Sequence, residues 1–323
     1  MNNLDERKEN SEKRFNQIKN KIEQSEFFKD NKDKLSNLCI YATGSFARQE
    51  ATDNSDLDIF LIEEGDVNGK NEITYKCGKL DEIKIFSELI KVGDDCGLPP
   101  FSNDGEFLKI FKYNEHESQI GAPSDDHDNW FTARMLLILE SKCLLNQERY
   151  DSLIEKIISF YFRDEKDDDF KPYFILNDIL RFWRTLCLNY EVSRTQHKNW
   201  EKKNISLKFS RRLTVFATIA YIFSLNITSK PDIISMIKMS PLTRLSIAIE
   251  KLGDKNIKKI HKDFLDKYMK FLDIKEKGNT SGSDDKVKKE LNELGRDPIF
   301  KELIYKVLLH KNIKQDLRLF LVS

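Results

Sequence analysis

The sequence predicts an α+β protein, in which a small mixed sheet with covering helices is followed by an all-α helical domain. The first observation is glycine: eight of the twelve glycines fall between Gly44 and Gly121, and none occurs from residue 122 to residue 252. Turns and loops between strands use glycine far more than helix interiors do. The second observation is apolar spacing, which is strand-like in two short runs before residue 63 and helix-like through most of the chain after residue 130.

Length and composition limit the class of protein. A chain of 323 residues is long enough for about two domains of roughly 150 residues each. Apolar residues make up 39% of it and charged residues 33%, which excludes disordered and fibrous proteins. The longest uncharged run, residues 213–229, is too short and too polar to span a bilayer and predicts a buried core helix.

The N-terminal residues and the cysteines indicate the compartment. The first residues, MNNLDERKENSEKR, lack the apolar stretch of a secretory signal. The cysteines are odd in number and scattered, with no spacing typical of a disulfide framework or a zinc site; they are Cys39, Cys77, Cys96, Cys143 and Cys187. We therefore expect a cytoplasmic protein with no membrane partner.

Charge is distributed unevenly along the chain. Residues 1–170 hold 23 Lys and Arg against 37 Asp and Glu, whereas residues 171–323 hold 31 against 17. A basic half is able to meet phosphate or another polyanion, and an acidic half is able to hold a divalent metal. Attraction between the two halves is the alternative explanation.

The N-terminal part divides into a helical segment at residues 1–37 and an α/β core at residues 38–122. Within the core we expect the order strand, helix, strand, helix, strand. The expected elements are one long helix or a helix pair within 4–37, strands at 37–43 and 56–62 with a short turn-and-helix segment between them, a helix at 79–92, and a third strand within 106–113.

Residues 123–323 form the expected helical domain, because their apolar residues recur at helical spacing. The segments with this spacing are 130–145, 150–162, 173–190, 205–225, 233–237, 242–252, 257–272 and 299–309. Residues 275–289 contain a single apolar residue, Val287, and are rich in Gly, Ser, Thr and charge. This composition predicts a mobile loop at 275–289.

One stretch carries most of the chemistry. Gly44 and Ser45 follow the first strand, where a glycine lets backbone N–H groups approach a phosphate closely and the following helix offers its N-terminus. Asp56 and Asp58 begin the second strand, and residues two apart on a strand point to the same face. Two neighbouring carboxylates repel each other unless a cation such as Mg²⁺ lies between them.

The chain combines three features in sequence order: a Gly-Ser turn after an apolar strand, a spacer of about ten residues, and an Asp-x-Asp strand. Together these features form a more specific pattern than any one of them alone. In this pattern the chain resembles the DNA polymerase β-like nucleotidyltransferases. The resemblance is tight over residues 37–62 and follows the order of elements over residues 1–120. Within that superfamily the wording GSFARQEATDNSDLDIFLI is similar to the N-terminal transferase region of the bacterial uridylyltransferases that modify a nitrogen-regulatory protein, and to stand-alone relatives.

The resemblance implies an enzyme of the EC 2.7.7 type. Such an enzyme transfers a nucleoside monophosphate from an NTP to a hydroxyl group, releases pyrophosphate and uses two Mg²⁺ ions. In this chain Gly44 and Ser45 would hold the β and γ phosphates, and Asp56 and Asp58 would ligate the metals. Nothing in the chain distinguishes ATP from UTP or CTP, so ATP is the default donor.

The superfamily's third carboxylate, on the next core strand, has several candidates here. We choose Asp104 as third catalytic and metal-binding residue, because Gly105 permits a sharp turn that aims it at the metals. Glu106, Asp81 and Glu82 are the alternatives, and the last two fall on the helix expected at 79–92. Without a third carboxylate, the site would bind a nucleotide and not turn it over.

Two basic positions are further candidates for nucleotide binding. Arg48 follows Gly44 by four residues and is placed to reach a triphosphate, or else to pair with Glu50 or Asp53 at the surface. In the helical half, Lys208 lies at helical spacing with Arg211 and Arg212, so these side chains either contact a nucleotide or form a solvated helix face.

The acceptor and the alternatives stay open. The acceptor is a protein hydroxyl, an RNA 3′ end or a small molecule, and the basic helical half favours a polyanionic acceptor. We do not expect double-stranded DNA as a partner. One alternative is a catalytically inactive nucleotide- or RNA-binding regulatory protein. Another is a synthase of an oligonucleotide second messenger.

Overall fold

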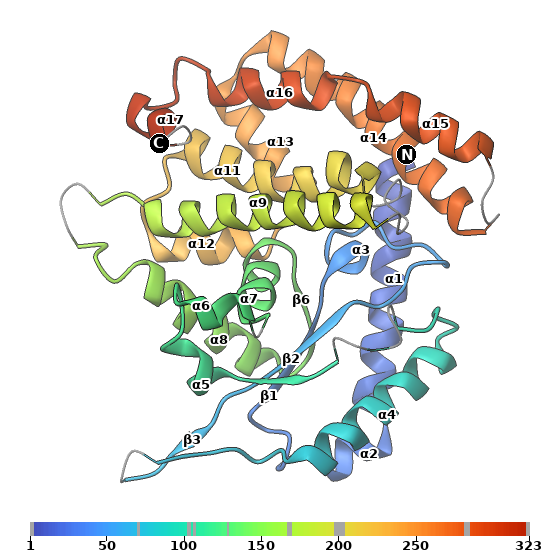
Figure 1. Ribbon diagram of the computed structural model, residues 1–323, viewed down its shortest axis with the longest axis vertical. Coiled ribbons are helices and arrows are strands. Elements are labelled where there is room, and N and C mark those ends of the chain that lie inside the picture. Colours follow the sequence, from blue (N-terminus) through green and yellow to red (C-terminus); the bar gives the residue numbers. More distant parts are fainter. Residues whose placement is uncertain are drawn as a thin grey trace. The chain divides into compact units, whose positions relative to one another are not determined.

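The computed structural model describes residues 3–69, 72–101, 105, 108–127, 129–166, 170–196, 204–280 and 285–320. The chain forms two compact units, Met1–Ile157 and Ile158–Ser323 (Figure 1). The boundary expected after residue 122 therefore falls inside the first unit. The physical reason is a strand, β6 (Lys142–Leu145), which pairs with the first strand of the sheet and so holds the residues around it in that unit.

The first unit confirms the expected order of strand, helix, strand, helix, strand. Its elements are α1 (Asn3–Gln24), α2 (Glu26–Asp30), β1 (Leu38–Ala42), α3 (Gly44–Ala47), β2 (Ile59–Glu63), β3 (Asp66–Val67), β4 (Ile73–Thr74), α4 (Lys79–Asp95), β5 (Ile110–Lys112), α5 (Tyr113–Glu117), α6 (Pro123–His127), α7 (Trp130–Leu139), β6 and α8 (Gln147–Tyr161), and α8 contains the unit boundary.

The main sheet has four strands in the order β5-β2-β1-β6. β1 is antiparallel to β2 and to β6, whereas β2 and β5 are parallel, so the sheet is mixed and the α+β class is confirmed. β6 lies in a segment for which we expected a helix from residue 130 to residue 145. A four-residue apolar run such as KCLL fits a helix or a strand equally well, and only its pairing with β1 decides.

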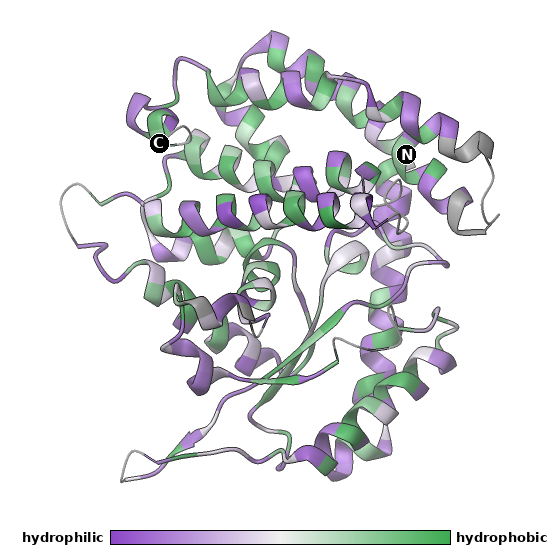
Figure 2. Ribbon diagram, viewed as in Figure 1, coloured by the Kyte–Doolittle hydropathy of each residue, from purple (hydrophilic) through white to green (hydrophobic). Residues whose placement is uncertain are grey.

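The core of the first unit lies between one face of this sheet and the helices α1 and α4. On β1 and β2, alternate residues such as Ile40 and Leu61 are buried there together with Phe15 of α1 and Leu89 of α4. Tyr41 and Phe60 point to the opposite face, where their rings stack and Tyr41 donates a 3.0 Å hydrogen bond to the Ala133 carbonyl of α7. Figure 2 shows the apolar residues along these strands.

The helix expected at 79–92 is confirmed by α4, but its buried face differs from the predicted stripe. Leu80, Ile83 and Ile90 are exposed, with relative exposures of 73%, 54% and 46%. The spacing that predicts this helix also includes Phe86, which is half-buried, and Leu89, which is buried as expected. Ile85 lies outside that spacing and is buried as well. Apolar spacing establishes the helical period, whereas the packing of α1 decides which stripe is covered.

The described regular elements of the second unit after α8 are helical. They are α9 (Tyr173–Thr195), the π-helical η2 (Leu207–Arg211), α11 (Arg212–Leu225), α12 (Lys230–Ile237), α13 (Pro241–Leu252), α14 (Lys255–Thr280), α15 (Asp285–Gly295), α16 (Ile299–Leu308) and α17 (Gln315–Phe320). Within the described chain, none of the helices has the length and apolarity that crossing a membrane requires.

The loop expected at 275–289 is largely helical. α14 continues to residue 280 and α15 begins at residue 285, while residues 281–284 lie outside the described part of the chain. A polar composition is compatible with a helix when a neighbouring helix covers its apolar stripe, and α14 packs against both α15 and α16.

The buried core helix expected at 213–229 is confirmed by α11. Nearly all its residues from Leu213 to Phe223 are buried, and it packs closely against α13. Arg244 of α13 is fully buried against it and donates a 2.9 Å hydrogen bond to the Thr218 hydroxyl. This polar contact lets an otherwise apolar interface hold a guanidinium group.

His261 of α14 makes acid stability a test of this packing. Burial lowers its pKa from 6.5 to about 4, with the Coulombic effect of Glu250 acting in the opposite direction. In the unfolded chain the His261 imidazole takes up a proton near pH 6.5, whereas in the folded chain it does so only near pH 4. The contribution of neutral His261 to the free energy of unfolding is therefore complete above pH 6.5 and is lost as the pH falls toward 4. We expect His261→Gln to flatten the fall in urea midpoint between pH 7 and pH 5. A fall as steep as that of the original chain would contradict this.

Candidate functional site

The site begins where the chain leaves β1. The Thr43 amide donates a 2.8 Å hydrogen bond to the Asp58 carbonyl, which continues the β1–β2 pairing one step beyond the strands. β2 itself starts at Ile59, so Asp56 and Asp58 lie just before the strand. We had expected both aspartates to lie within it. The pairing still places Asp58 directly beside the end of β1.

Gly44 and Asp58 are in direct contact. Gly44 has a φ of +66°, and a Cβ added to it would lie 2.6 Å from Oδ2 of Asp58. The carboxylate therefore occupies the space that any side chain at position 44 would need. The structure thus brings together the glycine of the expected phosphate loop and one of the two expected metal ligands.

Ser45 and Asp56 flank this contact. Ser45 is the second residue of the short helix α3, in the first turn, where the N–H groups of a helix have no acceptor within the helix. Its side chain and that of Asp56 are both partly accessible to solvent. Each is therefore open to a ligand that approaches the Gly44–Asp58 contact.

The structure reduces the number of candidates for the third carboxylate. Asp81 accepts a hydrogen bond from the Gly78 amide at the start of α4 and pairs with Lys34 at 2.6 Å, and the hydrogen bond from Lys34 lowers its pKa. Glu82 accepts a 3.0 Å hydrogen bond from the Ile110 amide and pairs with Lys79. Both alternatives on α4 are therefore engaged in holding the helix. Asp104 and Glu106 lie outside the described residues.

Lys109 is a residue that the sequence analysis missed. In the parallel pairing of β2 and β5, Leu61 lies opposite Ile110. One step earlier this register puts Lys109 beside Phe60, on the sheet face to which Asp58 also belongs. Its Nζ lies 4.4 Å from the ring centroid of Phe111. The sequence predicted a strand in this segment, but the register of its pairing with β2 cannot be obtained from apolar spacing alone.

Arg48 is a structural residue and not an accessible phosphate ligand. Its Nε donates to Glu50 and its Nη1 to Glu140, both at 2.9 Å, and the three side chains are almost completely buried. The Glu50 partner agrees with our alternative for this residue, although the pair is buried and not on the surface. Glu140 is 92 positions away in the sequence, so spacing gave no indication of it.

This buried network supports the turn at Gly44 and Ser45. The Glu50 amide donates a 2.8 Å hydrogen bond to the Ser45 carbonyl, and the Arg48 amide donates to the Gly44 carbonyl at 3.0 Å. Because Glu140 follows α7, the network ties the loop to that helix. Arg48 thus acts as a positioning residue for Gly44 and Ser45.

Lys208 belongs to the second unit, in the π-helical turn η2. Burial lowers its pKa, and the nearby positive charges of Arg212 and Arg296 lower it further. It is a half-buried cation among other cations, which differs from the solvated helix face that we considered as the alternative.

Two carboxylates are enough protein ligands to hold a Mg²⁺ ion. This ion is commonly bound through one or two carboxylates, with substrate phosphates and water completing its six ligands. The described residues contain no cluster of three or more His, Cys, Asp or Glu side chains suited to a metal. Because Gly44 has no side chain, the Asp58 carboxylate lies directly against its backbone, which fits a metal site that a phosphate completes.

Comparison with known protein families finds a match in this part of the first unit. Residues 24–95 match the family model of the nucleotidyltransferase domain. The matched segment of this nucleotidyltransferase domain includes β1, α3, β2 and α4 and ends before β5. It therefore contains Gly44, Ser45 and the two aspartates, but not residue 104. No curated protein and no solved structure matches the chain.

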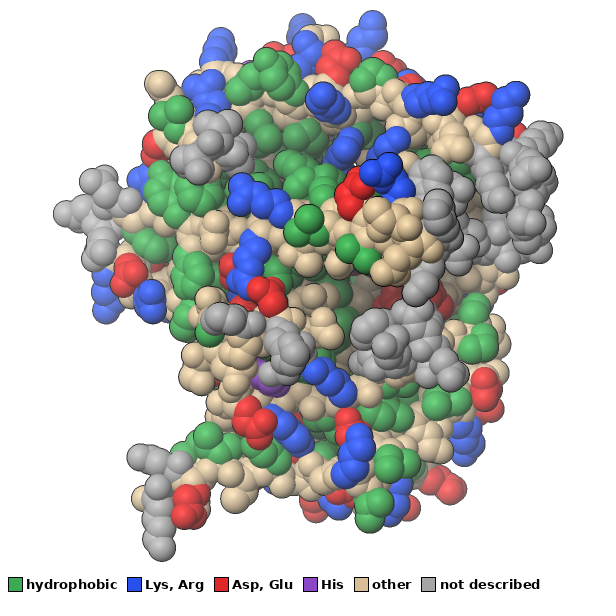
Figure 3. All heavy atoms as spheres, viewed as in Figure 1, with side chains coloured by type: hydrophobic (Ala, Val, Ile, Leu, Met, Phe, Trp, Pro, Cys, Tyr) green, Lys and Arg blue, Asp and Glu red, His purple; other side chains and the backbone are tan. Residues whose placement is uncertain are grey.

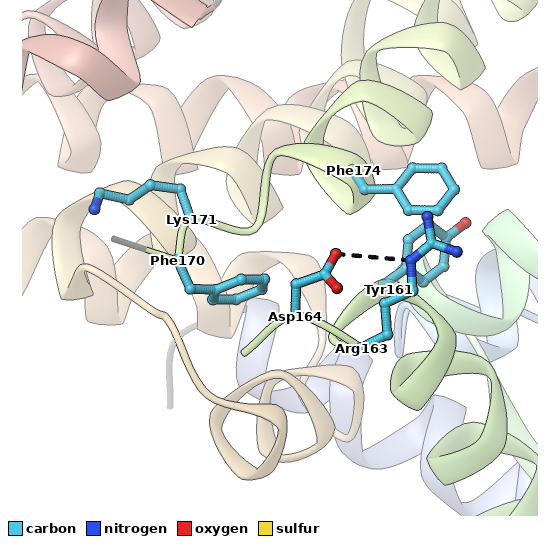
Figure 4. A pocket seen from close by; sticks show the side chains of 6 residues that line it. All are labelled: Tyr161, Arg163, Asp164, Phe170, Lys171 and Phe174. Carbon is cyan, nitrogen blue, oxygen red and sulfur yellow. Dashed lines mark ion pairs between the residues drawn. The ribbon is translucent and has the colours of Figure 1, made fainter. Parts of the chain in front are cut away.

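A pocket of about 360 Å³ lies in the second unit (Figure 4). The side chains of Tyr161, Phe170 and Phe174 form part of its lining, and Arg163 pairs with Asp164 at 3.7 Å on the exposed side. The Tyr161 hydroxyl donates a 2.6 Å hydrogen bond to the buried Asp178. Tyr161, Arg163 and Asp164 thus already have partners, and the pocket lies outside the segment that matches the nucleotidyltransferase domain.

Replacing Gly44 by Ala tests the contact with Asp58. An L-residue at positive φ costs about 1–2 kcal/mol, and the new methyl group displaces a carboxylate that lies 2.6 Å away. We expect nucleotide transfer to fall about 10²-fold, as for a misplaced catalytic group. Gly97→Ala is the matched control, because Gly97 has a φ of +63° but no atom within 4 Å of the added Cβ. Equal activity of the two variants would contradict the assignment.

Proposed function

We propose that this protein is a Mg²⁺-dependent nucleotidyltransferase that transfers a nucleoside monophosphate from an NTP, by default ATP, to a hydroxyl acceptor and releases pyrophosphate. The observation that carries the proposal is the contact between Gly44 and the Asp58 carboxylate within a segment that matches the nucleotidyltransferase domain. This contact places a glycine turn, whose backbone carries no side chain, next to a carboxylate that is able to hold a cation.

Each residue around the Gly44–Asp58 contact has a role in this proposal. The backbone at Gly44 and Ser45 binds the terminal phosphates, because the first N–H groups of α3 point out of the turn. Asp56 and Asp58 hold the divalent metal, and Asp104 is our proposed third ligand. When bound, Mg²⁺ lowers the pKa of the attacking hydroxyl and neutralises the leaving pyrophosphate.

The remaining residues act on position. The network of Arg48, Glu50 and Glu140 holds the turn after α3. Asp58 is held at the end of β1 by the hydrogen bond from the Thr43 amide to its carbonyl. The catalytic contribution of the protein is therefore orientation of the triphosphate against the acceptor hydroxyl.

Lys109 supports a second candidate function, a nucleotide-binding regulatory protein without turnover. Beside β2, Lys109 lies on the sheet face of Asp58, and it is a cation and not a carboxylate. A cation there is able to hold a phosphate but not a second metal ion. Catalysis then depends on Asp104 or Glu106.

One experiment separates the two functions. The protein is incubated with Mg²⁺ and each of the four labelled NTPs, alone and with total cellular RNA or protein, and pyrophosphate release is measured together with the melting temperature. Pyrophosphate release with a labelled acceptor supports the transferase. An NTP-dependent rise in melting temperature without pyrophosphate supports the regulatory protein. If neither signal appears with any NTP, both functions are excluded.

A further inference from the structure

Three cations lie close together in the second unit. We call Lys208 of η2, Arg212 at the start of α11 and Arg296 after α15 the basic cluster. Within the described part of this unit, no ion pair involves any of the three side chains. Asp297, the carboxylate that follows Arg296 in the sequence, pairs with Lys267 of α14, and Glu191 of α9 pairs with Arg194 at 2.7 Å.

The geometry brings the cluster together from separate segments. The aliphatic end of Lys208 lies against Gly295, since a Cβ added to that glycine would be 3.4 Å from Cδ and 3.5 Å from Nζ of the lysine. Arg296 is the next residue. α15 packs on α14, and η2 packs on α9 and α11. Arg296 and Lys208 therefore come from separate parts of the chain, and only the tertiary structure brings them together.

The turn that carries Lys208 is itself unusual. η2 is a π-helical segment of five residues, and such turns are rare and frequently occur at functional sites. The wider turn keeps Lys208 and Arg212 on one side while Phe209 and Ser210 are buried on the other. The guanidinium carbon of Arg212 lies 5.7 Å from the ring centroid of Trp183, which supports the plane of its N–H donors.

The cluster is electrostatically unfavourable without a counter-ion. Burial lowers the pKa of both Lys208 and Arg212, and the other two cations add to the effect on Lys208. Like charges that are partly removed from water destabilise the folded chain. An anion bound among them would offset this repulsion, and perturbed groups of this kind concentrate at functional sites.

We propose that Lys208, Arg212 and Arg296 bind a phosphate-bearing ligand on the second unit. Arginine binds phosphate through two parallel N–H donors, and lysine adds a point charge. The surrounding unit is basic, with 33 Lys and Arg against 22 Asp and Glu in residues 158–323, and Lys and Arg side chains are prominent on its visible face (Figure 3). The proposal extends the proposed function, since a nucleotide and a nucleic-acid acceptor both present phosphate.

Direct binding tests the cluster with the full chain. A fluorescein-labelled single-stranded RNA 10-mer is titrated at low salt and followed by anisotropy, and pyrophosphate binding is measured by calorimetry. The variant replaces Lys208, Arg212 and Arg296 by Gln. The matched control replaces Lys230, Lys258 and Lys306 by Gln, which removes the same charge from lysines that are paired with Glu165, Glu250 and Glu302.

We expect the cluster variant to lose about tenfold or more in affinity for at least one probe, as charge-assisted hydrogen bonds to phosphate are removed, and the control to lose far less. Loss for pyrophosphate alone identifies a nucleotide or pyrophosphate as the ligand, and loss for RNA identifies a nucleic acid. Equal losses in the two variants, or no binding by the original chain, would overturn the proposal.

Two further measurements keep the result interpretable. The melting temperature of the cluster variant should equal or exceed that of the original chain, because repulsion has been removed. If the triple variant does not fold, Lys208→Gln alone is compared with Lys258→Gln. All titrations are repeated with Asp56→Asn and Asp58→Asn, where affinity for the probes should persist even if transfer is absent. The cluster and the transferase site thus succeed or fail separately.

Discussion

Replacing Asp58 by Asn should reduce nucleotide transfer by about 10²–10³-fold, the range found when a group that stabilises charge in the transition state is removed. Asn keeps the shape of the carboxylate beside Gly44 but removes its charge, so the packing at this contact is preserved. Asp56→Asn should have an effect of the same order. Pyrophosphate release under saturating Mg²⁺ and NTP is the measurement.

Asp53→Asn is the matched control for these variants. Asp53 lies in the same segment, but its side chain is 87% exposed and pairs with Arg14 at 2.6 Å. We expect its transfer rate to stay close to that of the original chain. Transfer that survives in both Asp56→Asn and Asp58→Asn would reject the site, provided that the melting temperatures are unchanged.

Removing the Arg48 side chain should have the largest effect on stability. In Arg48→Met, the carboxylates of Glu50 and Glu140 stay buried and lose the guanidinium group between them. Breaking a buried ion pair by removing one partner costs about 3–5 kcal/mol, because the remaining charge is left uncompensated. We expect the urea midpoint to fall accordingly, and transfer activity to fall with it because the turn after α3 loosens.

Arg163→Met is the comparison for this prediction. Arg163 is 65% exposed and pairs with Asp164 at 3.7 Å, so its loss should cost less than about 1 kcal/mol. A double variant, Arg48→Met with Glu140→Gln, should recover part of the loss, since one buried charge is removed with its partner. Similar midpoints for Arg48→Met and Arg163→Met would show that the network does not stabilise the fold.

Much of the site follows from short-range pattern. The apolar run before Gly44, the turn and the alternation around Asp58 depend only on neighbouring residues, and the structure joins Gly44 and Asp58 as that pattern predicts. The roles of Gly44, Ser45, Asp56, Asp58 and Asp104 in binding and catalysis stay predictions. The helical period of α4 was also readable from spacing, although its buried stripe was not.

Other features depend on residues that are distant in the sequence. β6 became a strand only through its pairing with β1, which moved the boundary of the first unit to residue 157. Arg48 was assigned to phosphate because its partner Glu140 could not be foreseen, and Arg296 was not recognised as a neighbour of Lys208. The parallel register that puts Lys109 on the face of Asp58 belongs to the same group.

Local pattern was enough to predict the α+β class, the order of the first strands and helices, and the pairing of a glycine turn with a carboxylate, because backbone preference and hydrophobic period act over a few residues. The partners of buried charges and the clustering of cations were decided by the tertiary structure. Charges interact through space, and which of them meet depends on how the elements pack.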